Sequence, residues 1–251
     1  MKLTLLGGGG ERVDRGGGRA ERPGPIRASA MYRLQEALGA RFKDESGWRV
    51  ADVYTSVDDE ISRARSGVGL CDVSACGKLG VRGEAVEAWG PSVIGGPVPA
   101  VGRAAWEHVN GASVLVCRRS ADELLLLTPP REVAAVAGVL EKAAESGGCV
   151  HVTDLTAAFA IVDLIGDKLH ALLERLVALD LTAVPPLGVI QGDLARVHAI
   201  MVRSDHQALA VFRVIVAREY GDFVWRTLSD AGHDLGLTPV GAAAYSRMMS
   251  A

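Results

Sequence analysis

Residues 108–117, with the sequence HVNGASVLVC, predict two antiparallel strands joined by a two-residue turn. Asn110-Gly111 is a pair that a type I′ turn favours, because both central residues of that turn take positive φ angles. The apolar run after the turn continues as a strand to Cys117. We therefore expect a β-hairpin here, and an antiparallel sheet is the first element of the predicted fold.

The segments around this hairpin alternate strands and helices in two comparable halves. Strands are predicted over residues 70–73, 78–81, 123–128, on both sides of Asp154, and over 193–202 and 208–217, and helices over 34–42, 58–65, 84–89, 131–145, 167–176 and 220–231. The order is strands, helix, strands, helix. This pattern predicts an α+β chain built from two pseudo-duplicated antiparallel sheet and helix subdomains.

The chain divides into a leader and one domain with two halves. Residues 1–30 are rich in glycine, arginine and proline and offer little to bury, so we expect a disordered leader. The opening MKLTLL is too short for a secretory signal, and Met31, where patterned sequence begins, is a candidate for the true start. The domain is expected over 31–251, with halves of about 31–148 and 149–251.

The bulk composition argues against nucleic acid and membrane partners. The 251 residues carry 27 basic and 30 acidic side chains, a net charge of −3, and only 5% aromatic residues. A near-neutral chain has no long-range attraction for phosphate backbones, and so few aromatic residues offer no evident surface on which bases could stack. No apolar run approaches the length of a membrane span.

The cysteines and histidines indicate a reducing compartment and no metal site. The four cysteines, Cys71, Cys76, Cys117 and Cys149, lie in apolar or strand-adjacent contexts without a disulfide pattern, so we expect free thiols and a cytoplasmic location. The six histidines, His108, His151, His170, His198, His206 and His233, show neither an i,i+4 pair nor acid-rich spacing.

Three segments together resemble the glycine cleavage system T-protein, the folate-dependent aminomethyltransferase family. The first contains Gly47-Trp48, Tyr54, Glu60, Arg65, Gly69-Leu70, Asp72-Val73-Ser74, Gly77, Val81 and Gly83; the second and third are DLTAAFAIVDLIGDKLHALLERLVALDL (154–181) and EYGDFVWRTLSDAGHDLGLTPVG (219–241). The resemblance covers about 31–241. It implies the T-protein folate-binding fold, tetrahydrofolate as cofactor and a role in one-carbon metabolism. T-proteins continue into a C-terminal β-barrel for which this sequence has no room, so we expect a truncated form that resembles the sarcosine oxidase gamma subunit.

The sequence departs from the family at three chemically important positions. The family hairpin carries an aspartate beside the folate, where a carboxylate stabilises a developing iminium cation, whereas Asn110-Gly111 leaves no room for an acid. Arg213 stands where the family has a glutamate against the pterin, and Tyr245 where it has an arginine. We therefore expect no catalytic residue of the family type.

Four residues are candidates for cofactor binding. Trp106 matches a cleft tyrosine and Thr128 an asparagine of the family, and Asp72 and Ser74 occupy its Asp-Val-Ser motif. Each has a structural alternative: Trp106 as a core anchor, Thr128 as a strand-end cap, and Asp72 and Ser74 as turn or capping groups.

Three functional hypotheses remain open at this stage, and they leave open whether the chain is an enzyme. The first is a non-catalytic or partner-dependent subunit that works with flavin-dependent amine oxidase subunits. The second is an independent tetrahydrofolate-dependent aminomethyltransferase or demethylase with a rearranged pocket, which requires another acid such as Glu107, Asp154 or Asp163. The third is a folate-free scaffold that keeps only the fold.

Overall fold

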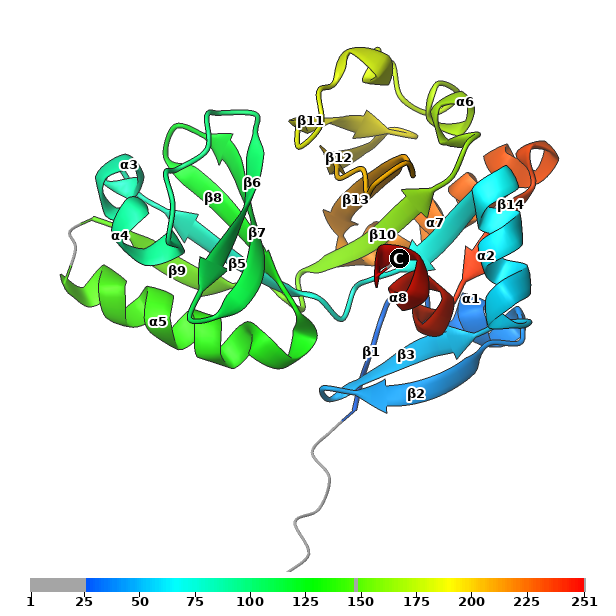
Figure 1. Ribbon diagram of the computed structural model, residues 1–251, viewed down its shortest axis with the longest axis horizontal. Coiled ribbons are helices and arrows are strands. Elements are labelled where there is room, and N and C mark those ends of the chain that lie inside the picture. Colours follow the sequence, from blue (N-terminus) through cyan, green and yellow to red (C-terminus); the bar gives the residue numbers. More distant parts are fainter. Residues whose placement is uncertain (1–25, 147–148, 251) are drawn as a thin grey trace, which may run out of the picture.

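Three β-sheets organise the chain in the computed structural model, which describes residues 26–146 and 149–250 (Figure 1). The first sheet has the order β1 (Arg27–Ala28), β3 (Trp48–Val53), β2 (Arg41–Glu45). The second has the order β6 (Ala104–Val109), β7 (Ala112–Ser120), β8 (Glu123–Thr128), β5 (Gly77–Arg82), β9 (His151–Asp154). The third has the order β11 (Val189–Leu194), β12 (Val197–Arg203), β13 (Val211–Ala217), β10 (Phe159–Ile165), β4 (Val68–Asp72), β14 (Leu237–Val240).

Helices accompany each of the two larger sheets. They are α1 (Tyr32–Ala37), α2 (Val57–Ser66), α3 (Val86–Trp89), α4 (Pro91–Ile94), α5 (Val133–Ser146), α6 (Leu169–Leu173), α7 (Gly221–Gly232) and α8 (Ala242–Ser250), with short 3-10 turns at 130–132, 181–183, 218–220 and 233–235. Helix α5 runs along the five-stranded sheet, and α6, α7, α2 and α8 surround the six-stranded sheet (Figure 1). The predicted α+β class is confirmed; no sheet closes into a barrel within the described residues, and no helix there has the length and apolarity to cross a bilayer.

The hairpin predicted at residues 108–117 is confirmed. Strands β6 and β7 pair as predicted, with Val109 opposite Ala112, and the turn residues Asn110 and Gly111 take φ angles of 51° and 79°. Both angles are positive, as a type I′ turn requires. The connection therefore has two residues and carries no acid.

Several predicted elements were wrong in extent; the helix predicted over 167–176 spans only Leu169–Leu173, and two others were cut by residues with positive φ. The helix predicted over 34–42 ends at Ala37, because Gly39 takes a φ of 80° and the chain from Arg41 pairs with β3 instead. The strand predicted over 193–202 is interrupted by a turn, in which Ala195 and Arg196 take positive φ angles of 50° and 69°. Neither residue is a usual turn former, so this turn could not be predicted from the residue types.

The predicted leader and the predicted boundary between the two halves can each be compared with the strands observed there. Residues 1–25 lie outside the described residues, whereas Arg27–Ala28 form β1 and Ser29 donates a hydrogen bond to Asp72. Pairing also crosses the predicted boundary between the halves: β4 joins the sheet of β10, and β9 joins that of β5. The division into two halves at about 148 and 149 stays a prediction.

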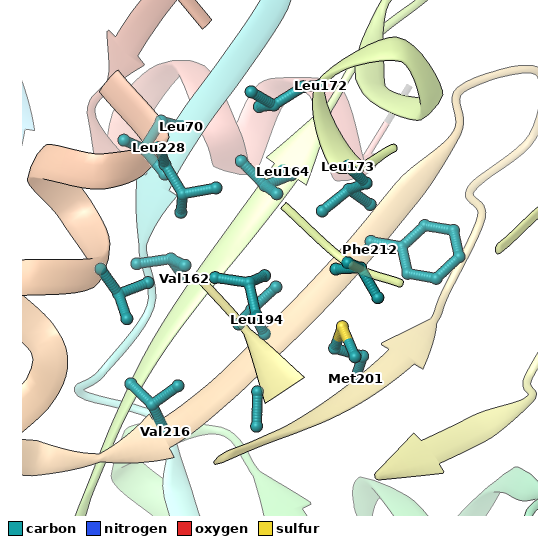
Figure 2. Packing of buried hydrophobic residues seen from close by; sticks show 14 of the residues in the cluster. Leu70, Val162, Leu164, Leu172, Leu173, Leu194, Met201, Phe212, Val216 and Leu228 are labelled. Atoms are coloured by element: carbon teal, nitrogen blue, oxygen red, sulfur yellow. The ribbon is translucent and has the colours of Figure 1, made fainter. Parts of the chain in front are cut away.

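Helices cover one apolar face of each large sheet. The opposite faces of the two sheets pack against each other. The largest apolar cluster lies between β4, β10, β12 and β13 on one side and α6 and α7 on the other; Figure 2 shows Leu164, Phe212 and Met201 within it. A separate cluster between the two sheets contains Leu115 and Leu127 of the five-stranded sheet and Ile161, Ile200 and Ile215 of the six-stranded sheet. Because side chains alternate along a strand, β10 and β13 contribute to both clusters.

Glu60 ties three parts of the chain together. Its carboxylate is 1% exposed and accepts backbone N–H bonds from Tyr54 at 2.6 Å, Thr55 at 3.0 Å and Gly241 at 2.8 Å. The backbone passes so close to β3 at Gly241 that a Cβ there would lie 2.1 Å from the carbonyl oxygen of Asp52. Glu60 thereby fixes the start of α8 against β3.

We expect Glu60→Gln to lower the free energy of unfolding by about 2–3 kcal/mol, because one amide group cannot accept all three bonds. Urea denaturation measures this loss. Glu36→Gln, at an exposed position on α1, is the matched control and should change stability by less than about 0.5 kcal/mol. Equal stabilities of the two variants would show that Glu60 does not hold this junction.

Lys78 is a buried cation at the start of β5. Its side chain is fully buried, and Nζ donates to the carbonyl oxygens of Ser74 at 2.6 Å and Thr156 at 2.9 Å. Nζ also lies 5.8 Å from the centroid of the Trp48 ring. Burial lowers the pKa of Lys78 from 10.5 to about 8, against the attraction of nearby acidic groups.

This depressed pKa makes stability depend on pH with a definite sign. Between pH 8 and pH 10.5 the unfolded chain binds more protons at Lys78 than the folded chain, so this group adds to stability as the pH rises. The wild type should therefore gain up to about 3 kcal/mol over Lys78→Met across that interval, as measured by urea denaturation. Parallel pH dependences for the two proteins would contradict the prediction.

Candidate functional site

An acid and a base lie directly opposite each other on two buried strands. Strands β10 and β13 are antiparallel neighbours, and their register pairs Asp163 with Arg213. On the same face, Ile161 pairs with Ile215 and Ile165 with Val211. The two charged side chains are therefore enclosed by apolar pairs on both sides.

The geometry of this pair is bidentate. Arg213 donates from Nε to Asp163 Oδ1 and from Nη2 to Asp163 Oδ2, both at 2.8 Å. Tyr245 of α8 donates its hydroxyl to Oδ2 at 2.6 Å and accepts from Arg213 Nη2 at 3.3 Å. Asp163 is completely buried, and 12% of the Arg213 side chain is exposed. We call these three residues the Asp-Arg-Tyr cluster.

Electrostatic interactions keep Arg213 charged and Tyr245 protonated. Burial by itself lowers the pKa of Arg213, but the charge and hydrogen bonds of Asp163 outweigh it and hold that pKa well above its usual value. Burial, together with the charge of Asp163, raises the pKa of Tyr245 well above 10. Arg213 therefore stays charged and Tyr245 stays a hydrogen-bond donor.

The cluster borders a cleft between the two large sheets. One cavity of about 400 Å³ is lined by residues of β4, β6, β8, β13 and α8, among them Trp106, Thr128, Asp72, Arg213 and Tyr245. A second cavity of about 400 Å³ shares Trp106, Arg213 and Tyr245 with the first and extends to the loop after β12. The two cavities share walls and form one cleft.

Comparison with known proteins assigns the chain to a family. The family model described as the GCVT N-terminal domain matches residues 31–249. The chain belongs to the GCVT N-terminal domain family. This bears out the resemblance drawn from the three sequence segments.

The curated relatives of this GCVT-domain chain are aminomethyltransferases. It is 25% identical over 223 residues to that of Saccharopolyspora erythraea, covering 86% of this chain and 60% of the relative. It is 26% identical over 235 residues to that of Moorella thermoacetica, covering 87% and 62%. The chain thus spans about three fifths of the length of these relatives.

Two solved structures share its fold. Glycine cleavage system aminomethyltransferase T from Bartonella henselae superposes with a TM-score of 0.78 at 19% identity, over 89% of this chain and 62% of that one. A chain of heterotetrameric sarcosine oxidase from Corynebacterium sp. U-96, solved in complex with pyrrole 2-carboxylate, superposes with a TM-score of 0.63 at 22% identity. That match covers 86% of this chain and 99% of the sarcosine oxidase chain.

Three of the four predicted binding residues line the cleft, and two of them, Trp106 and Thr128, differ in exposure. Trp106 is 52% exposed, so its alternative interpretation as a core anchor is wrong. It alternates along β6 with Glu107, and its indole stands over the cleft. Thr128 is 2% exposed, and its hydroxyl donates to the carbonyl oxygen of Pro129 at 3.1 Å.

Asp72 and Ser74 are engaged within the chain. Asp72 lines the cleft, but Oδ2 accepts from Ser29 at 2.5 Å and Gln35 at 2.7 Å, while Oδ1 accepts from the Ser74 N–H at 2.9 Å. Ser74 is 3% exposed; its hydroxyl donates to the carbonyl oxygen of Ile161 and accepts from the N–H of the same residue. Cofactor binding by either residue stays a prediction.

The three acids considered as replacements for the missing hairpin aspartate lie in different surroundings. Glu107 shares a face of β6 with Val109, whose cluster lies away from the cleft, and its carboxylate lies beside Gly96. Asp154 is exposed and accepts the Thr156 N–H at 2.8 Å. Asp163 is completely buried and does not itself line either cavity; Arg213 and Tyr245, which do, bind both of its oxygens.

Tetrahydrofolate, the cofactor that the resemblance implied, does not fit the polar wall of this cleft in the family manner. The amino-pyrimidine edge of a pterin presents N–H donors and requires acceptors, for which a carboxylate is the natural partner. Asp72 and Asp163 each accept three hydrogen bonds from the protein, and Arg213 presents donors. Of these four residues, only Trp106 suits a pterin, because its exposed ring face could stack on a flat ring.

Within this GCVT-domain fold, the pairing of Asp163 with Arg213 generates a double-mutant prediction. Asp163→Leu and Arg213→Met each leave one buried charge without its counter-ion, and each should cost about 3–5 kcal/mol of unfolding free energy. The double variant Asp163→Leu with Arg213→Met removes both charges and should cost less than either broken pair. Urea denaturation gives the coupling energy; additive losses would contradict the pairing.

Proposed function

We propose that this chain is a partner-dependent subunit of T-protein fold that serves one-carbon metabolism without aminomethyl transfer of its own. The observation that carries the proposal is the Asp-Arg-Tyr cluster. Methylene transfer to a folate requires a carboxylate free to stabilise an iminium cation or to move a proton. Here Asp163, buried behind the wall of the cleft, is bound by Arg213 at 2.8 Å and by Tyr245 at 2.6 Å.

The hairpin supports the same conclusion from the opposite wall. The two-residue turn at Asn110-Gly111 presents no carboxylate to the cleft, and Glu107 on the adjoining strand faces away from it. The role left for the Asp-Arg-Tyr cluster is to hold β10, β13 and α8 together around the cavity. No step of this proposal depends on bound tetrahydrofolate, whose recognition remains a prediction from the resemblance.

A partner is supported by the match to the sarcosine oxidase chain, which this chain covers over 99% of its length. That protein is a heterotetramer. We propose by analogy that subunits of a flavin-dependent amine oxidase are the partners. A cytoplasmic location is part of the proposal and is supported by Cys71, Cys76, Cys117 and Cys149, which are all free thiols.

Activity is tested with the purified chain, tetrahydrofolate and an aminomethylated lipoyl carrier protein. We expect no methylene-tetrahydrofolate above the uncatalysed background, because no acid of the cleft is free to assist the transfer. The aminomethyltransferase of Moorella thermoacetica is the positive control. Turnover by the purified chain comparable to that control would refute the proposal.

Partnership is tested by purifying the tagged chain from its native cells at its natural expression level. The proposal predicts stoichiometric recovery of additional subunits together with flavin absorbance. The isolated chain, expressed alone, is the control and should carry no flavin. Recovery of the chain alone from native cells, without flavin, would contradict the partner-dependent role.

A further inference from the structure

The wall of the cleft offers hydrogen-bond donors and few free acceptors. Arg213 uses Nε and Nη2 on Asp163 and Tyr245, but no described residue accepts a bond from Nη1, and that atom is not fully enclosed. The hydroxyls of Ser113 and Ser204 line the cleft and have no hydrogen-bond partner among the described side chains and backbone.

His206 adds a polar atom to the same wall. Its Nε2 is buried and has no hydrogen-bond partner in the described part of the chain, and the residue lines the second cavity beside Arg213. A buried imidazole nitrogen without a partner carries a desolvation cost. Nε2 can serve as a donor when it carries the proton.

The acidic side chains around the cleft are already committed to the protein. Asp72 and Asp163 accept three hydrogen bonds each, and Asp205 accepts from Arg203 at 2.7 Å and from the Val211 N–H at 3.1 Å. At the rim, Glu45 is paired with Lys43 at 3.1 Å. Of the groups that remain for a ligand, Arg213 Nη1 can only donate and the two serine hydroxyls can donate or accept, so a ligand that brings acceptors satisfies all of them.

The remaining walls favour a flat apolar body. Val73, Leu127, Pro129 and Met249 line the first cavity, and the half-exposed Trp106 indole stands where an aromatic ring could stack on it. A volume of about 400 Å³ lies within the usual range of small-molecule sites.

We infer that the cleft binds a flat aromatic carboxylate, with its ring against Trp106 and its carboxylate toward Arg213 Nη1 and the neighbouring hydroxyls. The inference rests on the proposed function in placing the ligand in the cleft of a non-catalytic subunit. It deepens that function by naming the ligand class. A free aromatic acid carries its carboxylate on the ring, whereas a folate carries an amide there and its carboxylates on a glutamate tail, so titration with tetrahydrofolate separates the two.

The experiment is isothermal titration of the isolated chain with 2-naphthoate, and with 2-naphthamide as the uncharged counterpart. Naphthoate should bind at least about tenfold more tightly than the amide, because charge-assisted hydrogen bonds are stronger than neutral ones. Tetrahydrofolate is titrated in parallel. Binding of tetrahydrofolate alone, absence of heat with naphthoate, or equal affinities for acid and amide would each overturn the inference.

Two variants on exposed aromatic residues locate the ligand without endangering the fold. Trp106→Ala should weaken naphthoate binding about tenfold or more, whereas Phe223→Ala, at a 48% exposed position on α7 outside the cleft, should leave it unchanged. Equal affinities of both variants and the wild type would place the ligand elsewhere and refute the inference.

The charge-balanced double variant Asp163→Leu with Arg213→Met tests whether Arg213 recognises the carboxylate of the ligand. It should lose the preference for acid over amide while keeping ring binding through Trp106. A retained preference in a folded double variant would exclude Arg213 as the recognition group. None of these results bears on transferase turnover or partner recovery, so failure of the ligand inference is distinguishable from failure of the proposed function.

Discussion

The register between β10 and β13 places Asp163 opposite Arg213 in a setting that is otherwise apolar. A buried ion pair is stable only when both charges are present and their hydrogen bonds are satisfied, because either charge alone carries a large desolvation penalty. Tyr245 completes the set from α8, and the start of α8 is held by Glu60 through the Gly241 N–H. One electrostatic requirement thus links two strands, a helix and the wall of the cleft.

This constraint also determines what the cleft can do. In the T-protein family, as the resemblance describes it, acids face the folate and assist the movement of a one-carbon unit. In this chain the corresponding surface carries Arg213, whose guanidinium binds Asp163, a completely buried acid behind the cleft wall. A cavity of about 400 Å³ lies at this surface, and Arg213 adds a donor to its wall. A binding or assembly role follows more directly from this arrangement than catalysis.

Local chemistry made part of this structure predictable from sequence. Asn110-Gly111 specified its turn, and strand 123–128 stood out by its apolar run before two prolines. The turn at Ala195-Arg196 was missed because neither residue favours positive φ. Trp106 was correctly placed at the cleft, although its exposure could not be inferred from a strand that alternates between two partly covered faces.

The Asp-Arg-Tyr cluster was beyond sequence reasoning for a topological reason. Asp163 and Arg213 were each singled out, but they lie 50 residues apart, and their strands are neighbours only because β11 and β12 fold to the outer side of β13. A signal was present in retrospect: β10 and β13 each carry a single charged residue, of opposite sign, at the centre of an apolar run. That pattern predicts pairing once the strands are known to be adjacent.

The most direct test of the account is nitrogen-15 NMR of the Arg213 side chain in the purified chain, with its Nε–H signal assigned by its loss in Arg213→Lys. A guanidinium held by a buried carboxylate should give a separate, slowly exchanging Nε–H resonance. A signal averaged with those of solvent-exposed arginines would mean that Asp163 does not hold Arg213 and is free to act, and it would contradict the account.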